Sequence, residues 1–225
     1  MIRGVIFDVD GVLLDSLAVW NDLGERYVRK CGYEPVKNMS QIIAEMSMED
    51  GAVWIRNTYG MNKESELIVT ELEEMLKEFY SKEVQVKPGV LELLSFLEEK
   101  KIPCVAATSG MKSLTLAGFK GNGIDRYISE VITEEEVGKD KHHADIFCKA
   151  CNYLQTEVSE TLVVEDSLYA LKTAHKAGFL TAGMQEKYSE KDREKIRKTA
   201  DFYCCDMNEL KGVIENENSI NNSRK

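Results

Sequence analysis

Residues 5–16 of this chain read Val-Ile-Phe-Asp-Val-Asp-Gly-Val-Leu-Leu-Asp-Ser. An apolar run stops at two aspartates, Asp8 and Asp10, which are separated by one residue and followed by Gly11. Side chains alternate along an extended strand, so the pattern predicts that both carboxylates point to the same side at a strand end. Gly11 then permits a sharp turn. Two carboxylates this close favour a bound cation, although acids that merely cap a turn before a helix would leave the same pattern.

Composition limits the class of protein. The chain has 225 residues, of which 43% are hydrophobic and 30% charged, as in an ordinary globular protein. Its net charge of −10 argues against nonspecific binding to nucleic acid or to an anionic membrane surface. No apolar run reaches the roughly 18 residues of a membrane span, and the first residues lack a signal-peptide pattern. We therefore expect a cytoplasmic protein.

Helical and strand patterns divide the chain into two regions. Residues 16–84 carry apolar side chains at helical spacing and contain no convincing strand pattern, which predicts an inserted helical domain. In residues 1–15 and 85–215, short apolar runs alternate with helical segments. This alternation predicts an α/β core with a parallel sheet and right-handed crossovers. The polar segment 216–225 is predicted to be disordered.

Residues that can bind a metal ion or a phosphate, through carboxylates, hydroxyls or backbone N–H groups, follow three of the predicted strands. They are Asp8 and Asp10 after the first strand, Thr108, Ser109 and Gly110 after the second, and Glu165 and Asp166 after the run Thr161–Val164. In an open parallel sheet, ligands bind beyond the carboxyl ends of the strands. Four carboxylates at one point need a divalent cation, and an all-oxygen ligand set favours Mg²⁺. The hydroxyls and helix-opening N–H groups suit a phosphate, although Thr-Ser-Gly alone would also form a plain helix N-cap.

The ordered set of motifs resembles that of the haloacid dehalogenase-like hydrolase superfamily, in the branch of β-phosphoglucomutase and many small-molecule phosphatases. Residues 8–16 are similar to motif I of this family, residues 107–110 to motif II and residues 164–167 to motif IV. The resemblance extends from residue 5 to about residue 210. It implies a Rossmann-like three-layer sandwich around a parallel sheet, with residues 16–84 as an α-helical cap domain that closes over the strand ends.

Motif III is where the chain departs from the family pattern. The family usually has Gly-Lys-Pro-x-Pro-Asp-x-Phe, whereas residues 138–147 read Gly-Lys-Asp-Lys-His-His-Ala-Asp-Ile-Phe. Counting back from Asp145 places the family lysine at Lys141. Lys139 keeps the preceding glycine but would require a two-residue insertion. We favour Lys141 and expect it to lie within salt-bridge reach of Asp8, with Lys139 pointing elsewhere.

The resemblance implies a role for each matching residue. Asp8 would attack phosphorus and become an aspartyl-phosphate, and Asp10 would act first as general acid and then as general base. Phosphate binding is implied for Thr108, Ser109, Gly110 and Lys141, and a catalytic role also for Thr108 and Lys141. Mg²⁺ binding is implied for Asp8, Asp166 and the backbone carbonyl of Asp10, and for Glu165 directly or through water. The expected protein is a monomer that acts on a small phosphorylated metabolite such as a sugar phosphate.

Two other functions remain open at this point. Mutases similar to β-phosphoglucomutase carry a cap arginine that binds a second phosphate, and Met48 stands at the corresponding position of residues 45–50, which favours hydrolysis. Some proteins of this fold serve as binding modules after losing a catalytic residue, but every candidate residue is present here. The sequence therefore predicts a Mg²⁺-dependent phosphatase, with a phosphomutase and a non-catalytic binding module as the alternatives.

Overall fold

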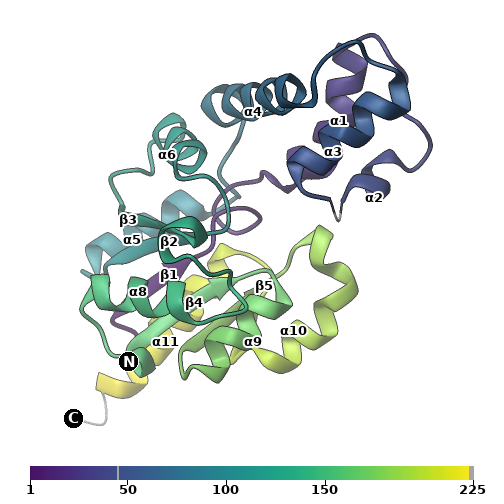
Figure 1. The fold of residues 1–225 in the computed structure, drawn as a ribbon. Helices are drawn as coiled ribbons and strands as arrows, with labels where there is room; N and C mark the ends of the chain where they lie inside the picture. Colours follow the sequence, from purple (N-terminus) through teal and green to yellow (C-terminus); the bar gives the residue numbers. More distant parts are fainter. Residues whose placement is uncertain (45, 223–225) are drawn as a thin grey trace. The chain divides into compact units, whose positions relative to one another are not determined.

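The structure is a computed structural model that describes residues 1–44 and 46–222. The chain divides into two compact units, which Figure 1 shows in the colours of the sequence. One unit comprises Met1–Asp15 and Gln85–Lys225, and the other comprises Ser16–Val84. We call the first the core unit and the second the helical unit.

A six-stranded parallel sheet forms the centre of the core unit, in the order β3-β2-β1-β4-β5-β6. Its strands are β1 (Gly4–Phe7), β2 (Cys104–Thr108), β3 (Ile128–Thr133), β4 (Thr161–Glu165), β5 (Leu180–Met184) and β6 (Phe202–Cys204). Strand β1 lies between β2 and β4 and is buried along its whole length. An apolar strand without alternation is typical of a parallel sheet covered on both faces. The predicted α/β fold with a parallel sheet is confirmed.

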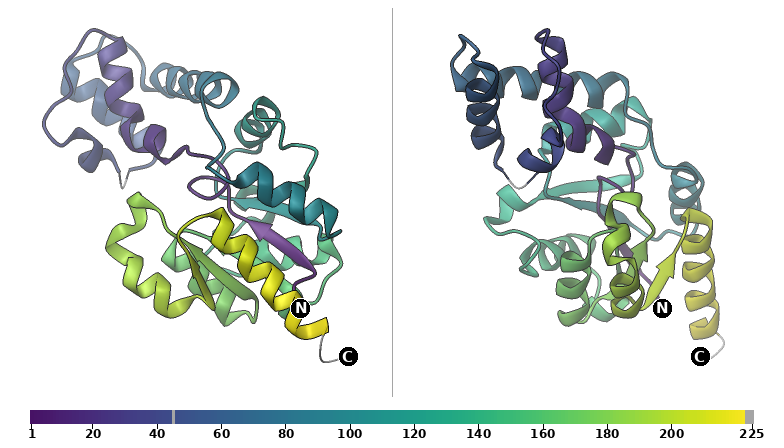
Figure 2. Two further views of the ribbon diagram at one scale, coloured as in Figure 1. Left: turned by 180° about the vertical axis from the view of Figure 1, so that it is seen from behind. Right: turned by 90° about the vertical axis from the view of Figure 1, so that its right-hand side faces the viewer.

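Helices cover both faces of the sheet and complete the three layers (Figure 2). One layer contains α8 (Asp145–Leu154), α9 (Leu168–Lys176) and α10 (Arg193–Thr199), and the other contains α5 (Val90–Glu99), α6 (Lys112–Gly121) and α11 (Met207–Asn222). The first layer buries Ile146, Phe147 and Ala170 against Ile6 and Val163 of the central strands. This arrangement leaves the carboxyl edge of the sheet to the loops that follow the strands.

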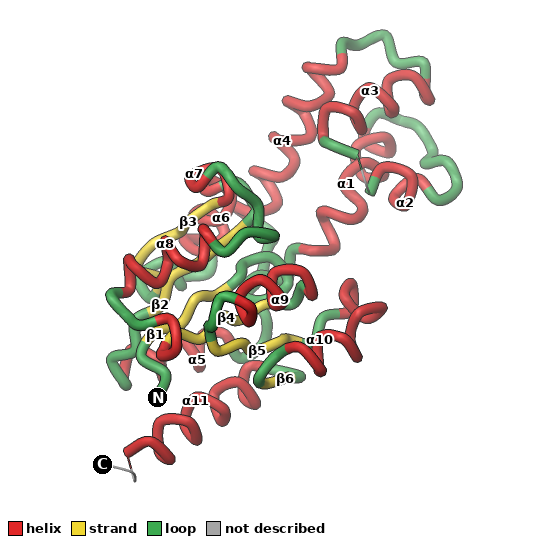
Figure 3. Tube along the Cα trace, turned by 60° about the horizontal axis from the view of Figure 1, so that its bottom comes forward, coloured by secondary structure: helices red, strands yellow, loops and turns green. Residues whose placement is uncertain are grey.

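The helical unit contains α1 (Leu17–Lys30), α2 (Met39–Ile43), α3 (Met48–Tyr59) and α4 (Ser65–Lys82), drawn in red in Figure 3. Apolar side chains at helical spacing are buried in it, including Leu23 of α1 and Leu72 and Leu76 of α4. Trp20 Nε1 donates a hydrogen bond to the Tyr80 hydroxyl at 2.8 Å, which joins α1 to α4. Within the described part of the chain, no helix combines the length and the apolar character needed to cross a membrane.

Helix α11 corrects the prediction of disorder for residues 216–222, because it continues to Asn222. The side chain of Asn218 accepts a hydrogen bond from the Ile2 N–H at 2.7 Å and donates one to the Ile2 carbonyl at 3.2 Å. These bonds tie the helix to the start of the chain, and Ile214 is fully buried one turn earlier. Composition does not reveal such a tertiary contact. Residues 223–225, also within the predicted tail, lie outside the described residues.

Candidate active site

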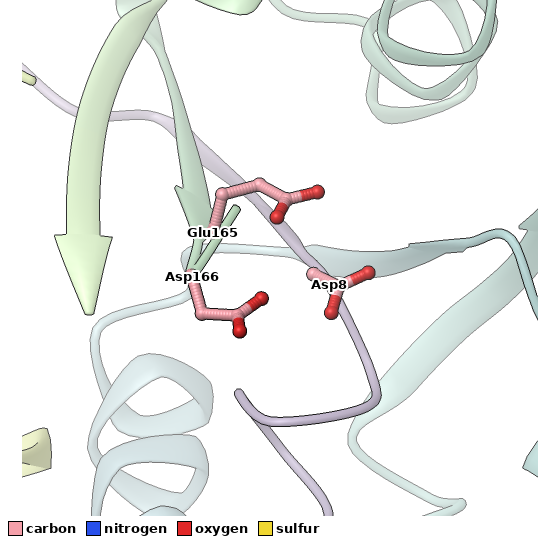
Figure 4. A group of neighbouring side chains, drawn as sticks. All are labelled: Asp8, Glu165 and Asp166. Atoms are coloured by element: carbon pink, nitrogen blue, oxygen red, sulfur yellow. The ribbon is translucent and has the colours of Figure 1, made fainter. Parts of the chain in front are cut away.

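Acidic side chains from two neighbouring strands meet at the carboxyl edge of the sheet. Asp8 follows β1, Glu165 ends β4 and Asp166 follows it. The Asp8 N–H donates to the Val164 carbonyl at 2.9 Å, which extends the β1–β4 ladder and fixes Asp8 beside the two β4 acids. One carboxylate oxygen from each of the three acids lies within 4.8 Å of the other two, and Figure 4 shows the carboxylates converging.

Lys141 supplies a cation to this cluster. Its ammonium group forms an ion pair with Asp8 and a second one with Glu165, with 2.6 Å between Nζ and Oε1. Only 2% of the Lys141 side chain is exposed. Lys139 instead pairs with Asp145 at the surface, with 2.7 Å between Nζ and Oδ1. The structure thus places Lys141, and not Lys139, beside Asp8, as expected from counting back from Asp145.

Burial dominates the ionisation of the cluster. It raises the pKa of the Asp8 carboxyl well above its ordinary value, and it raises that of Asp166 to about 7, with the Glu165 carboxylate adding to both shifts. Burial would lower the pKa of Lys141, but the carboxylates of Asp8 and Glu165 outweigh burial and raise it. When all are ionised, the three carboxylates and the one ammonium group carry a net charge of −2. That charge matches a divalent cation.

Serine hydroxyls hold the two acids of β4 in place. Ser167 Oγ donates to Glu165 Oε2 at 3.0 Å, and Ser189 Oγ donates to Asp166 Oδ2 at 3.1 Å. Because Glu165 Oε1 accepts from Lys141, both oxygens of Glu165 already have partners within the protein. Glu165 is therefore better placed to orient Lys141 than to act as the principal ligand of a cation.

Asp10 lies beyond the end of β1, where it forms an isolated β-bridge with Leu14 and is not part of a strand. Strand β1 ends at Phe7, so strand alternation does not apply to Asp10, and its side chain is not among the three clustered acids of the described chain. The turn begins where the Val9 carbonyl accepts three backbone N–H groups, and Gly11 has the positive φ of 91° that the sequence suggested. The Asp10 carboxylate instead lies near Gly110: Oδ2 is 3.2 Å from where a Cβ at that residue would stand.

The three residues after the second predicted strand take different positions. Thr108 is the last residue of β2, is 1% exposed, and accepts a hydrogen bond at Oγ1 from the Gly110 N–H at 2.9 Å. Thr108 Oγ1 and Asp10 Oδ2 border the same space, because each lies 3.2 Å from the Cβ position of Gly110. Ser109 is exposed, and its hydroxyl donates to Glu134 at 2.8 Å. The structure therefore groups Thr108 with Asp10 and directs the Ser109 side chain elsewhere.

Glu134 is a site residue that sequence reasoning missed. It is the first residue of α7 (Glu134–Val137), immediately after β3. Its Oε1 accepts from Ser109 Oγ at 2.8 Å and from the Lys141 N–H at 2.7 Å, so it joins the loop after β2 to the loop that carries Lys141. The signal that the sequence offered was an acid, Glu134, at the end of a fourth strand, β3. Three consecutive glutamates there resemble an ordinary acidic helix start, which hides it.

Comparisons with known proteins identify similar sequences and folds. Residues 5–184 match the family model described as "Haloacid dehalogenase-like hydrolase". The chain is similar to "Putative pyrophosphatase PpaX" of Clostridium perfringens, with 29% identity over 222 residues that cover 97% of this chain and 100% of that protein. It is similar to "Phosphorylated carbohydrates phosphatase" of Thermotoga maritima, with 23% identity over 78% of this chain and 82% of that protein. A solved "putative beta-phosphoglucomutase" of Thermotoga maritima has the same fold, with a TM-score of 0.82 at 20% identity over 96% of this chain and 99% of that one.

Proposed function

The chain belongs to the haloacid dehalogenase-like hydrolase family, and we propose that it is a Mg²⁺-dependent phosphatase for a small phosphorylated metabolite such as a sugar phosphate. The observation that carries the proposal is the buried Lys141 ammonium group, which joins Asp8 to Glu165 beside Asp166. This arrangement combines a candidate carboxylate nucleophile with a fixed cation. Its remaining charge of −2 could be balanced by a divalent cation. Relatives named as phosphatases support the class of reaction.

The donor set fits Mg²⁺. Carboxylate oxygens are the ligands this ion prefers, and the cluster's charge of −2 would be balanced by it. We assign direct binding to Asp8, Asp166 and the backbone carbonyl of Asp10, with Glu165 close by because both of its oxygens have protein partners. When bound, Mg²⁺ would neutralise charge on the phosphoryl group.

In the first half of the reaction, an Asp8 oxygen bonds to phosphorus while the bond from phosphorus to the ester oxygen breaks. Asp10 donates its proton to the departing oxygen, so the product leaves as a neutral alcohol. Lys141, oriented by Glu165, stabilises the negative charge of the transferring group. Thr108 Oγ1 accepts from a backbone N–H, which leaves its hydroxyl proton for a phosphate oxygen.

In the second half, water attacks the phosphorus of the aspartyl-phosphate. Asp10, now ionised, takes a proton from that water as the new bond forms. The bond from phosphorus to Asp8 breaks, which releases inorganic phosphate and regenerates the Asp8 carboxylate. Asp10 is again protonated and ready for the next substrate.

The helical unit supports hydrolysis over mutase chemistry. A mutase needs a cation for a second phosphate, but Met48 begins α3 in the segment where that arginine would fall, and residue 45 of the same segment lies outside the described residues. Each arginine of the helical unit forms an ion pair with an acid of the same unit. The pairs are Arg26 with Asp22 at 2.8 Å, Arg29 with Glu25 at 3.0 Å and Arg56 with Glu64 at 3.6 Å.

A substrate panel tests the function. Sugar phosphates, nucleotides and phosphorylated acids should be ranked by kcat/KM from the release of inorganic phosphate with Mg²⁺ present. We expect release from at least one class, and from a generic aryl phosphate. Isomerisation of a sugar phosphate without phosphate release would favour the mutase. Absence of release from every member of the panel would favour the binding module.

Removal of the metal should lower turnover about 10³-fold, because several kcal/mol of charge stabilisation in the transition state are lost. The measurement is phosphate release in excess EDTA, followed by the addition of excess Mg²⁺, which should restore the rate. As a matched comparison, Asp166→Asn should raise the Mg²⁺ concentration needed for half-maximal rate, whereas Asp125→Asn, at an exposed acid between α6 and β3, should not. Full turnover in excess EDTA would contradict the metal assignment.

Asp10→Asn should slow hydrolysis of the covalent intermediate by about 10²- to 10⁴-fold, because an amide cannot take a proton from water. An aryl phosphate has a good leaving group that needs little protonation, so its first step should suffer less. The fraction of enzyme carrying covalent phosphate, measured by acid quench during turnover, should therefore rise in Asp10→Asn. A fraction equal to that of the wild type would argue against Asp10 as the general base.

A further inference from the structure

Lys87 lies outside every motif described above, yet its side chain joins three segments of the core unit. Its Nζ donates to the backbone carbonyl of Gly11 at 2.9 Å and forms an ion pair with Glu186. The Lys87 side chain is 20% exposed and that of Glu186 only 4%. Gly11 follows Asp10 in the turn after β1, Lys87 lies in the segment where the chain returns to the core unit, and Glu186 lies two residues beyond the end of β5.

The first contact acts on the turn that carries Asp10. The Gly11 N–H donates to the Leu14 carbonyl at 2.9 Å, and the Lys87 N–H donates to the Leu13 carbonyl at 2.9 Å. Lys87 therefore binds the same turn through both its main chain and its side chain. Only one peptide unit separates the carbonyl held by Lys87 from the Cα of Asp10, so a shift of that carbonyl also moves the Asp10 side chain.

The second contact acts on the segment that supports Asp166. Glu186 precedes the short helix η2 (Lys187–Asp192), and its Oε1 accepts from the Tyr188 N–H at 3.4 Å. Ser189 of the same helix donates to Asp166 Oδ2 at 3.1 Å. Glu186 thus anchors the segment from which Asp166 receives its hydrogen bond, and Lys87 is the cation that balances the buried Glu186 carboxylate.

We propose that Lys87 is a positioning residue that holds the Asp10 turn and the Asp166-supporting segment in fixed relation. The inference rests on the proposed function, because it concerns the two acids that the mechanism uses. The burial of the Glu186 carboxylate gives such a link its rigidity, since Lys87 cannot move away without leaving that carboxylate without a cation. A displacement of about 1 Å at a reacting group can cost about 10²-fold in rate, so this link bears directly on turnover.

The effects of the two Lys87 contacts can be told apart by comparing Lys87→Met with the double variant Lys87→Met/Glu186→Gln. Lys87→Met leaves the buried Glu186 carboxylate without a cation and the Gly11 carbonyl without the lysine hydrogen bond, so both Tm and kcat should fall. Adding Glu186→Gln removes the unpaired charge and should recover most of Tm. The double variant still lacks a group to hold Gly11, so its kcat should stay about 30- to 100-fold below the wild type, with KM changed by less than about threefold. Lys195→Met, at an exposed lysine paired with Asp192, is the matched control and should alter neither quantity.

Covalent phosphate distinguishes positioning from stability. With an aryl phosphate as substrate, Lys87→Met/Glu186→Gln should accumulate more acid-quenched phosphoenzyme per folded molecule than the wild type, because a misplaced Asp10 slows the water step. Recovery of kcat together with Tm, or an unchanged phosphoenzyme fraction, would overturn the inference. Failure of the proposed function is distinguishable, because it would remove turnover from the wild type as well, whereas failure of the Lys87 inference leaves wild-type turnover intact.

Discussion

Asp8→Asn should reduce turnover by about 10⁴-fold or more, the scale expected when a catalytic nucleophile is removed. An amide has nearly the shape of the carboxylate but cannot form an acyl phosphate. Lys141 retains Glu165 as a partner, at 2.6 Å, so the rest of the cluster should keep its arrangement. Phosphate release at saturating Mg²⁺ measures the effect.

Folding of the Asp8→Asn variant provides its control. Burial raises the pKa of Asp8, which means that an ionised Asp8 costs the folded state free energy above the carboxyl's ordinary pKa. The neutral amide removes that cost, so at neutral pH the variant should unfold at a temperature equal to or above that of the wild type. Residual turnover near the wild-type rate, in a folded variant, would exclude Asp8 as the nucleophile.

Lys141→Ala should lower kcat/KM by about 10³-fold, whereas Lys139→Ala should change it by less than about twofold. The two lysines lie in one loop, two residues apart, and differ in what they contact. Lys141 is buried against Asp8 and Glu165, while half of the Lys139 side chain is exposed beside Asp145. Only Lys141 can therefore stabilise the transferring phosphoryl group.

Loss of the buried ammonium group also leaves the carboxylates of Asp8 and Glu165 without their cation, which costs about 3–5 kcal/mol of stability. Thermal unfolding should therefore be measured for both variants, with and without Mg²⁺. Lys141→Gln, which keeps a hydrogen-bond donor, separates charge from folding: it should fold better than Lys141→Ala and remain as inactive. Equal losses of kcat/KM for Lys139→Ala and Lys141→Ala would contradict the role given to Lys141.

The loop of Lys141 keeps its place without the two prolines of the family pattern. The His142 N–H donates to Asp140 at 3.1 Å, and the Lys141 N–H donates to Glu134 at 2.7 Å. The His142 ring stacks on Tyr169, with 4.5 Å between centroids and 18° between planes. These contacts restrain the loop in the way that a fixed proline φ otherwise would, and they hold Lys141 beside Asp8.

The centre of the sheet was predictable because β1, β2 and β4 are apolar, fully buried runs followed by polar residues, the pattern that a parallel strand covered on both faces requires. The acids at the ends of β1 and β4 were predictable for the same reason. The bond between Ser109 and Glu134 and the pair of Lys87 with Glu186 were not. Each joins segments distant in sequence, for which no local pattern exists.

The helical end of the chain shows the same limit. Residues near Asn218 are polar and lack an apolar stripe, so composition predicts disorder. Two hydrogen bonds to Ile2, 216 residues away in sequence, stabilise the helix instead. Local propensity decides such a segment only when no tertiary partner is present.

The position of the covalent phosphate decides whether Asp8 is the nucleophile. The wild type and Asp10→Asn should be acid-quenched during turnover of an aryl phosphate with Mg²⁺, and the phosphorylated peptide identified by mass spectrometry. We predict an acyl phosphate on Asp8, at higher occupancy in Asp10→Asn than in the wild type. Phosphate on Ser109 or Ser167, or none in either protein while inorganic phosphate is released, would contradict the mechanism.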